Sequence, residues 1–382
     1  MRWVAVLGVG ISRFGKRSEG LIDLLSESAV MALDDAGVEQ VDELVVANMA
    51  SGEFEGVSGV GSILVSRLGL EPARAYKVEA TSGSGGAAIY VASNSILSGM
   101  SKVALVVGGE KMTTKETPEV SEVIASILDE DDRAHGLTLP SLAAFSARNY
   151  MREFGATRES LASIAVKNHY NGSLNPHAHF RKRITIEEVL SSPIVCDPLR
   201  IYDYCPISDG AAAVILADIN VAKKYRDKFP VIRGIGYASD TNSPIERDFL
   251  FEMPAVRRAA EMAYAASKRG PRDIDIVELH DMATILEVII SEELGLFERG
   301  RGWKAAEEGV TSLDGELPIN TSGGLKAKGH PIGATGVAQL VEVSMQLLGE
   351  CGERQVQDAK VGLTCNVSGF GAGVTVAVVE VI

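Results

Sequence analysis

The chain has 382 residues, 46% of them hydrophobic, which suffices for two ordinary domains or one large unit with a substantial core. Its formal net charge of -14 excludes proteins that hold nucleic acid through clustered Lys and Arg. The four cysteines form no Cys-x-x-Cys pair and no apolar run is long enough to span a membrane, which argues against a zinc site, a disulfide framework and a membrane anchor. We expect a globular, cytoplasmic protein.

The first elements alternate between short apolar strands and helices. A strand over 4–7 leads into Gly8-Val9-Gly10, which begins like a dinucleotide-binding fingerprint but lacks the third glycine and the helix. Apolar residues at helical spacing predict a helix over 21–36, and an apolar run predicts a strand over 44–47. A helix over 58–68 follows, so the order is typical of an α/β fold with a parallel or mixed sheet.

The stretch from Tyr76 to Gly99 reads as a strand, a turn and a central helix. Small residues over 81–86 predict a sharp turn, and the helix over 87–97 is apolar on nearly every face, which is typical of a buried position. Its N-terminus presents free N–H groups and a positive dipole end, so Ser82 lies where a nucleophile or a bound anion would sit. Taken alone, the stretch is more simply explained as a packing turn without chemistry.

The next segment interrupts the alternation and then returns to it. Strands are predicted over 103–109 and 209–217, and helices over 141–154 and 158–170. Between the strands, residues 111–200 are interpreted as a loop domain folded over one face of the sheet, and the acidic run 129–132 as a solvated loop. The first half of the protein is therefore predicted to span residues 1–228.

The second half, residues 229–382, repeats the pattern. Helices are predicted over 254–267 and 283–293, and strands over 274–279, 360–363 and 374–381. A glycine-rich stretch that includes Gly329-His330-Pro331 precedes a further helix of small residues. Because each half places a Gly/Ser turn before a small-residue helix, we infer an internal duplication with the two central helices packed together.

Three reactive side chains in the second half lie at or near a strand end or beside glycine: His280, His330 and Cys365. Each one alone is more simply explained as structural. Ligand sites of open α/β sheets lie at strand ends, so all three could converge with Ser82. Together they would supply the nucleophile, the base and the stabilising donors that acyl transfer needs.

These residues carry a family resemblance. Asn320-Thr321-Ser322-Gly323-Gly324, followed by Gly329-His330-Pro331 and by Gly333-Ala334-Thr335-Gly336, resembles the hallmark of the thiolase superfamily. Other stretches resemble its sterol-carrier-protein-x and archaeal branch: Glu278-Leu279-His280-Asp281, residues 206–212 and residues 106–112. The resemblance covers essentially the whole chain. It implies the duplicated, five-layered α/β/α/β/α thiolase fold, with 111–200 as the loop domain over the active site.

The resemblance also implies roles for individual residues. The family nucleophile aligns with Ser82, and His330 is the residue that activates it. Cys365 matches the thiol that moves a proton at the α-carbon of the acyl unit, and His280 matches the residue that holds one thioester oxygen with His330. The backbone N–H groups of Ser82 and Val367 match the second oxyanion hole.

The resemblance breaks at the nucleophile, because the family pattern Cys-x-Ser-Gly aligns with Ser82-Gly83-Ser84-Gly85. A thiol ionises beside a helix N-terminus and a His, whereas a serine hydroxyl needs a base to remove its proton during attack. Three explanations stay open: a deliberate replacement of Cys, a natural protein with lost or altered catalysis, or a true acyl-accepting serine. Met282 stands where the branch often has another Cys, so Cys365 is the only candidate thiol for proton transfer.

The implied function is that of an acyl-CoA acyltransferase of the acetyl-CoA C-acetyltransferase type, acting by thioester exchange and Claisen condensation or thiolysis. The implied substrate is a coenzyme A thioester, with no bound cofactor, and the implied assembly is a homodimer or dimer of dimers. Hydroxymethylglutaryl-CoA synthase and a small OB-fold/zinc-ribbon protein are the implied partners, in the mevalonate pathway of lipid metabolism. The alternative is a non-catalytic CoA-binding scaffold subunit in that assembly.

Two further groups of residues are interpreted from the sequence alone. Lys326 and Lys328 lie shortly before His330 and face either CoA or solvent. His177 and His179 are read as part of a polar loop, because no third metal ligand is placed near them.

Overall fold

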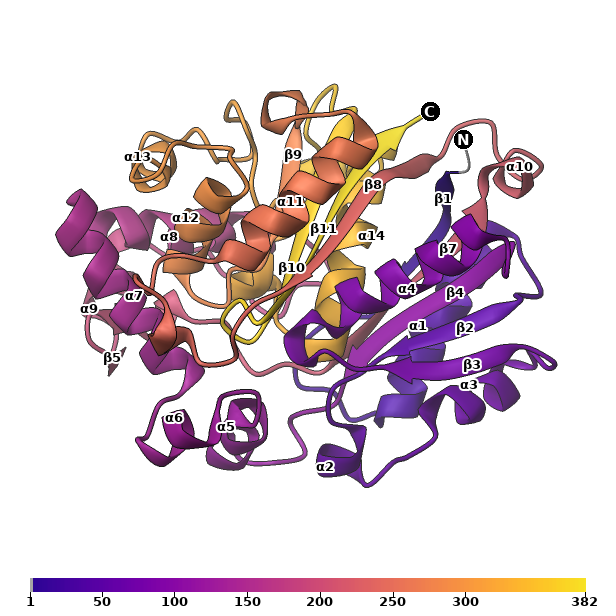
Figure 1. Ribbon diagram of the computed structural model, residues 1–382, viewed down its shortest axis with the longest axis horizontal. Helices are drawn as coiled ribbons and strands as arrows, with labels where there is room; N and C mark the ends of the chain where they lie inside the picture. The colour runs from indigo at the N-terminus through magenta and orange to yellow at the C-terminus, as the bar shows by residue number, and fades with distance from the viewer. Residues whose placement is uncertain (1–2) are drawn as a thin grey trace.

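The protein is described from a computed structural model, which defines residues 3–382; Met1 and Arg2, at the start of the predicted N-terminal segment, lie outside the described residues. Within this range, nine strands form one mixed sheet in the order β3-β2-β4-β7-β1-β8-β11-β10-β9 (Figure 1). Their bounds are β1 Val4–Ile11, β2 Glu43–Ala47, β3 Arg74–Val78, β4 Val103–Glu110, β7 Gly210–Asp218, β8 Pro230–Ser239, β9 Ile276–Leu279, β10 Val361–Ser368 and β11 Gly373–Val381. The predicted α/β class with a mixed sheet is confirmed.

The sheet consists of two parts that meet at one short seam. The first five strands in the order come from the N-terminal part of the chain, and the last four come from the C-terminal part. Only Val4 and Ala5 of β1 pair with Ile232 and Val231 of β8 to join them. The predicted division at residue 228 falls just before β8 and, as a statement about domains, stays a prediction.

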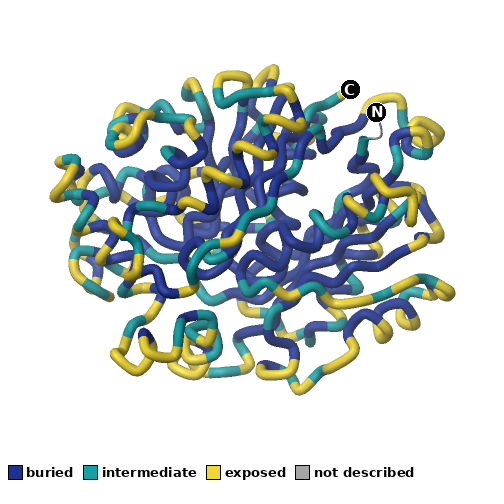
Figure 2. The backbone as a smooth tube through the Cα atoms, viewed as in Figure 1, coloured by how far each residue is buried: buried dark blue, intermediate teal, exposed yellow. Residues whose placement is uncertain are grey.

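Helices from outside the inserted segment 111–200 form three layers around the two parts of the sheet (Figure 1). The outer layer on the first part is α1 Leu21–Ala36 and α3 Val60–Leu68; the central layer is α4 Ser84–Ser98 and α14 Thr335–Leu348; the outer layer on the second part is α11 Pro254–Ser267 and α12 Thr284–Glu293. A separate apolar cluster fills each interface, and the central one contains side chains from both parts of the sheet. Figure 2 shows the buried residues concentrated along the strands and the helices between them. The five-layered fold is confirmed.

The segment predicted as a loop domain is largely helical. It contains α5 Thr117–Ala125, α6 Glu130–Ala134, α7 Leu139–Phe154, α8 Arg158–Leu174, α9 Ile186–Ser191 and a hairpin of β5 Ile194–Cys196 with β6 Leu199–Arg200. The remaining short helices are α2 Ser51–Glu55, α10 Ile219–Ala222 and α13 Gly302–Glu307. None of the helices in residues 3–382 combines the length and apolar character that crossing a bilayer requires.

Three local predictions are corrected. The acidic run is a helix, α6, because Asp129 caps it through the Asp131 N–H at 2.9 Å, and buried Asp132 accepts a hydrogen bond from Ser243. The strand predicted over 4–7 runs on to Ile11 and includes Gly8-Val9-Gly10, and a Cβ on Gly10 would come within 2.2 Å of a backbone oxygen of α1, so this glycine allows close packing of β1 and α1. Helix α4 exposes Asn94 and is not buried on every face, whereas α14 is buried along almost its whole length.

The central helices touch through glycine. A Cβ on Gly336 of α14 would lie 2.3 Å from the backbone nitrogen of Gly86 in α4 and 2.4 Å from Oδ1 of Asn366. We expect Gly336→Ala to lower the free energy of unfolding by about 3 kcal/mol, because backbone atoms on both sides must move apart. Gly52→Ala in α2, where the Cβ would meet nothing within 4 Å, is the control and should change stability by less than about 1 kcal/mol. Denaturant titration of both variants measures this, and equal effects would contradict the role of the contact.

Candidate active site

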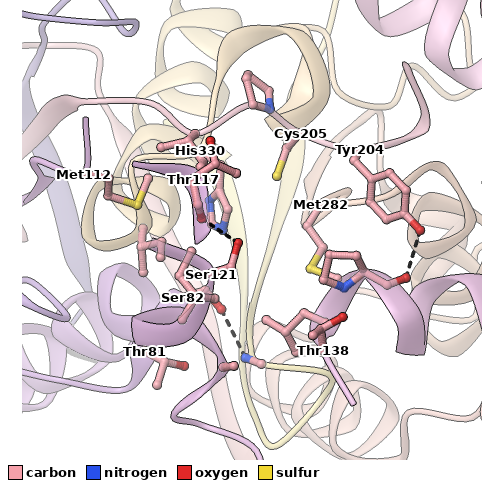
Figure 3. A pocket seen from close by; sticks show the side chains of 18 of the residues that line it. Thr81, Ser82, Met112, Thr117, Ser121, Thr138, Tyr204, Cys205, Met282 and His330 are labelled. Atoms are coloured by element: carbon pink, nitrogen blue, oxygen red, sulfur yellow. Dashed lines mark hydrogen bonds between the residues drawn. The ribbon is translucent and has the colours of Figure 1, made fainter. Parts of the chain in front are cut away.

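A cavity of about 400 Å³ lies where the two parts of the fold meet the inserted helical segment (Figure 3). Ser82 and His330 line it, together with residues of α5 and α7 such as Ile124 and Leu139. Most of its wall is apolar, and Figure 3 shows Ser82 and His330 facing Tyr204 and Met282 across the space. The inserted segment therefore forms one side of the site, and strand and helix ends form the other.

Ser82 lies in a single helical turn directly before α4. The preceding residue, Thr81, has φ +44°, a left-handed conformation that costs a β-branched residue about 1–3 kcal/mol and that is typical of functional turns. The Ser82 hydroxyl donates to the carbonyl oxygen of Val367 at 2.9 Å and accepts from the N–H of Gly369 at 3.1 Å. The hydroxyl is thus held between backbone groups of the second half of the chain.

His330 is positioned so that one ring nitrogen is free to accept a proton. The Thr335 hydroxyl donates to the carbonyl oxygen of Pro331 at 3.1 Å, so it receives the Nδ1–H of His330, at 2.6 Å. The second ring nitrogen, Nε2, is then unprotonated. Burial, assisted by the charge of Lys328, lowers the pKa of His330 to about 3, which keeps the imidazole neutral.

His280 follows the end of β9 and presents the opposite tautomer. Its Nδ1 accepts from the side-chain amide of Asn366 at 3.2 Å and lies 3.4 Å from the N–H of Val367, so Nε2 carries the proton. Among the described residues, this buried Nε2–H has no hydrogen-bond partner. Burial, with a smaller effect of His330, lowers the pKa of His280, and the two imidazole centroids are 5.0 Å apart. The site therefore pairs an acceptor nitrogen with an unused donor.

Asn366 and Gly369 complete the site and were not predicted from the sequence. The Asn366 amide donates to the carbonyl oxygen of Ser82 at 3.0 Å and accepts from the N–H of Gly86 at 2.9 Å. It therefore joins the turn that holds Ser82, the start of α4 and His280. The signal available in the sequence was only a polar residue inside an otherwise apolar strand.

Cys365 requires a correction. Strand β10 runs to Ser368, further than predicted, so Cys365 lies in mid-strand and its side chain faces the opposite side of the sheet from that of Asn366. The thiol is fully buried in the apolar cluster that also contains Leu363 and Val367, and burial raises its pKa. The cavity lining does not include Cys365, so the structure does not bring this thiol into the group around Ser82.

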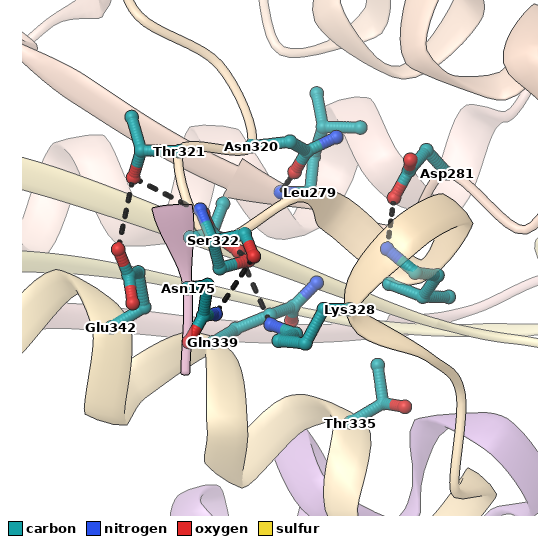
Figure 4. A network of polar contacts seen from close by, with 12 residues as sticks. Asn175, Leu279, Asp281, Asn320, Thr321, Ser322, Lys328, Thr335, Gln339 and Glu342 are labelled. Atoms are coloured by element: carbon teal, nitrogen blue, oxygen red, sulfur yellow. Dashed lines mark hydrogen bonds and ion pairs between the residues drawn. The ribbon is translucent and has the colours of Figure 1, made fainter. Parts of the chain in front are cut away.

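The loops that carry the two histidines are held by buried charges. Glu278, two residues before His280, accepts from the N–H and the hydroxyl of Ser322 at 2.9 and 2.6 Å. Lys328, two residues before His330, lies 3.4 Å from the same carboxylate. Figure 4 shows Lys328 and Ser322 close to one another in this network. Lys326 and Lys328 are each only 1% exposed, so of the two alternatives left open by the sequence, CoA or solvent, their burial excludes solvent.

A second buried carboxylate connects the His330 loop to the first half. Glu110 accepts from the N–H groups of Gly333, Met49 and Ala50 at 3.0–3.1 Å and from the side chain of Asn48 at 2.7 Å. Burial raises its pKa to about 7, against the effect of these donors. Within residues 3–382, no group of three His, Cys, Asp or Glu is arranged to hold a metal ion.

Comparisons with known proteins agree in one family. Residues 4–220 match the family described as "Thiolase, N-terminal domain", and residues 236–381 match "Thiolase C-terminal domain-like". An acetyl-CoA acetyltransferase from Methanothermobacter thermautotrophicus is 42% identical over 97% of this chain and 97% of its own length. Sterol carrier protein 2 from Bos taurus is 34% identical over 98% of this chain and 71% of its own length. A solved structure described as "Ltp2-ChsH2(DUF35) aldolase" has the same fold, with a TM-score of 0.85 at 24% identity over 99% of this chain and 97% of that chain.

Proposed function

The chain belongs to the thiolase family, and on this premise we propose that it transfers acyl groups between coenzyme A thioesters, with Ser82 as the acyl acceptor. The observation that carries the proposal is that the Ser82 hydroxyl and the neutral His330 line one apolar cavity, while the ring of His280, whose Nε2–H has no partner among the described residues, lies 5.0 Å from that of His330. These groups come from both halves of the chain. They are the nucleophile, the base and the donor that acyl transfer requires.

In the proposed reaction, His330 Nε2 takes the proton of the Ser82 hydroxyl while Oγ attacks the thioester carbonyl carbon. The carbonyl oxygen becomes negative and is stabilised by backbone N–H groups, for which Gly369 is a better candidate than Val367, because the Gly369 N–H already reaches Ser82 Oγ. The carbon–sulfur bond then breaks, and the coenzyme A sulfur takes the proton from His330. The Nε2–H of His280 is proposed to hold the thioester oxygen of the second acyl unit.

The test is thiolysis of acetoacetyl-CoA by the protein with Ser82, by Ser82→Cys and by Ser82→Ala as the inactive control. A thiol is more acidic than a hydroxyl and needs less help from a base as weak as His330. We therefore expect Ser82→Cys to be faster than the protein with Ser82 by about 100-fold, or about 2.7 kcal/mol of barrier. Equal rates for the protein with Ser82 and for Ser82→Cys, both above the Ser82→Ala control, would contradict this ranking and make serine a fully competent nucleophile.

The alternative function is a non-catalytic scaffold that binds coenzyme A thioesters. It is favoured by the Ser82 hydroxyl, which is already satisfied on both sides by backbone groups. If neither the protein with Ser82 nor Ser82→Cys turns over while acetyl-CoA still binds in calorimetry, the scaffold replaces the enzyme as the proposed function.

Partners and cellular context belong to the proposal as well. The description of the matched aldolase structure names a DUF35 component, and this supports a small protein partner for the present chain. Homodimerisation, association with hydroxymethylglutaryl-CoA synthase, a mevalonate-pathway role and a cytoplasmic location stay predictions from the family resemblance. Co-purification followed by mass measurement of the intact assembly tests them.

A further inference from the structure

One thiol does line the cavity, and it belongs to a residue without an assigned role. Cys205 is half-buried, and Figure 3 shows its sulfur atom turned into the cavity between His330 and Met282. The backbone N–H of Cys205 donates to the carbonyl oxygen of Met282 at 2.9 Å. Cys205 is therefore the direct spatial neighbour of the position where a proton-transferring Cys was expected and Met282 stands.

Three other side chains of the lining are poorly suited to the same role. Tyr204 donates its hydroxyl proton to the carbonyl oxygen of Pro140 at 2.8 Å. Ser121 donates to the carbonyl oxygen of Thr117, also at 2.8 Å. Met282 has no acidic proton to give. These three side chains are consequently poor proton carriers toward a substrate.

We propose that Cys205 is the catalytic residue that moves the proton at the substrate α-carbon, in the role that the sequence analysis assigned to Cys365. This inference rests on the proposed function, since it needs an acyl unit on Ser82. It differs from that function in assigning the carbon–carbon bond step to a separate side chain.

The protons and electron pairs of thiolysis balance with this assignment. When the bond between the α- and β-carbons of a 3-ketoacyl-CoA breaks, its electron pair remains on the α-carbon side as an enolate. The Cys205 S–H protonates that carbon and becomes a thiolate, and acetyl-CoA leaves. Incoming coenzyme A gives its thiol proton to the Cys205 thiolate and attacks the ester on Ser82. The carbon–Oγ bond breaks, and Ser82 Oγ recovers its proton from His330.

The surroundings of Cys205 suit both forms of the thiol. Burial raises the pKa of Cys205 to about 12, which keeps the resting thiol protonated and ready to act as an acid. The Lys326 ammonium donates to the carbonyl oxygen of Tyr204, the preceding residue, at 2.5 Å, and its charge favours the thiolate once it forms. In this proposal, the function of the buried Lys326 is to stabilise the Cys205 thiolate.

The experiment compares two reactions of one variant. Exchange of labelled coenzyme A into acetyl-CoA needs Ser82 and His330 but no proton at the α-carbon, whereas thiolysis of acetoacetyl-CoA needs both. We expect Cys205→Ala to slow thiolysis by about 100-fold or more and to leave exchange within about threefold, in both the Ser82 and the Ser82→Cys backgrounds. Cys196→Ala, a half-buried thiol outside the cavity lining, is the matched control and should change neither rate.

The outcomes separate this inference from the proposed function. Thiolysis that persists within threefold in Cys205→Ala overturns the inference, and so does an equal loss of both reactions, which would indicate a structural role. Exchange without any thiolysis in either parent also overturns it, yet leaves acyl transfer to Ser82 in place. Absence of both reactions in both the Ser82 and the Ser82→Cys proteins would contradict the proposed function and therefore also this inference.

A second measurement does not depend on turnover. Prolonged iodoacetamide labelling at pH 9, mapped by mass spectrometry, should modify Cys196 and, more slowly because its thiol stays mostly protonated, Cys205. Saturating acetyl-CoA should slow labelling of Cys205 at least fivefold further without protecting Cys196. Equal protection of both, or of neither, would place Cys205 outside the substrate's reach and overturn the inference.

Discussion

Replacing His330 with Ala is expected to reduce exchange of coenzyme A into acetyl-CoA by about 10²–10⁴-fold, the usual contribution of a positioned general base. The effect is large because the Ser82 hydroxyl has backbone groups as its hydrogen-bonding partners, and the free acceptor nitrogen at the cavity belongs to His330. The measurement is the initial rate in whichever background, Ser82 or Ser82→Cys, is active. An effect below fivefold would remove His330 from the base role.

The matched control for His330 is Thr335→Val, which keeps the ring and removes the hydroxyl that accepts its Nδ1–H. We expect an intermediate loss, because the imidazole can then adopt either tautomer and only one of them leaves Nε2 free. Both variants should retain the unfolding midpoint of the parent within a few degrees. A rate loss that merely follows a loss of folded protein would contradict the catalytic interpretation.

The second large effect is expected for Lys328→Met, which leaves the buried carboxylate of Glu278 without its cation. Removing one partner of a buried ion pair costs about 3–5 kcal/mol, and we expect a decrease of this size in the free energy of unfolding. The exposed pair of Arg67 with Asp23 is the comparison, since Arg67→Met should cost at most about 1 kcal/mol. Denaturant titration at pH 8 measures both.

Two further observations identify the origin of the Lys328 effect. The double variant Lys328→Met with Glu278→Gln should recover more than half of the lost stability, because no unpaired buried charge remains. The Lys328 charge also lowers the pKa of His330, so its removal should raise that pKa and move the acid limb of the rate profile to higher pH. A double variant as unstable as the single one, with an unmoved acid limb, would show that Lys328 acts through packing alone.

The sequence predicted the elements whose burial is periodic. Helix α11 has the bounds expected for it, 254–267, because its apolar residues recur at helical spacing and Pro254 marks its first turn. The positions of Ser82 and His330 at the starts of the two central helices also followed from local patterns of glycine and small residues. The conformation of each of these elements is determined by residues that are close together in the sequence.

The misplaced residues depend on partners distant in sequence. The strand predicted over 360–363 is shorter than β10, because pairing with β11 extends β10 to Ser368. Because both residues belong to the strand, the side chain of Cys365 lies in the apolar cluster and that of Asn366 points toward Ser82. Cys205 was missed for the same reason, because only the folded chain brings it beside Met282.

On the proposed function, the division of the site between the halves also determines when the protein becomes reactive. Ser82 belongs to the first half, whereas His280, His330, Asn366 and Gly369 all belong to the second. During synthesis the proposed nucleophile therefore leaves the ribosome long before its base and its donors exist. A partly made chain that ends before them would have no means to take an acyl group from the pool of cellular thioesters. Acyl transfer would thus report that the last strands have docked, which a measurement of helix content would not reveal.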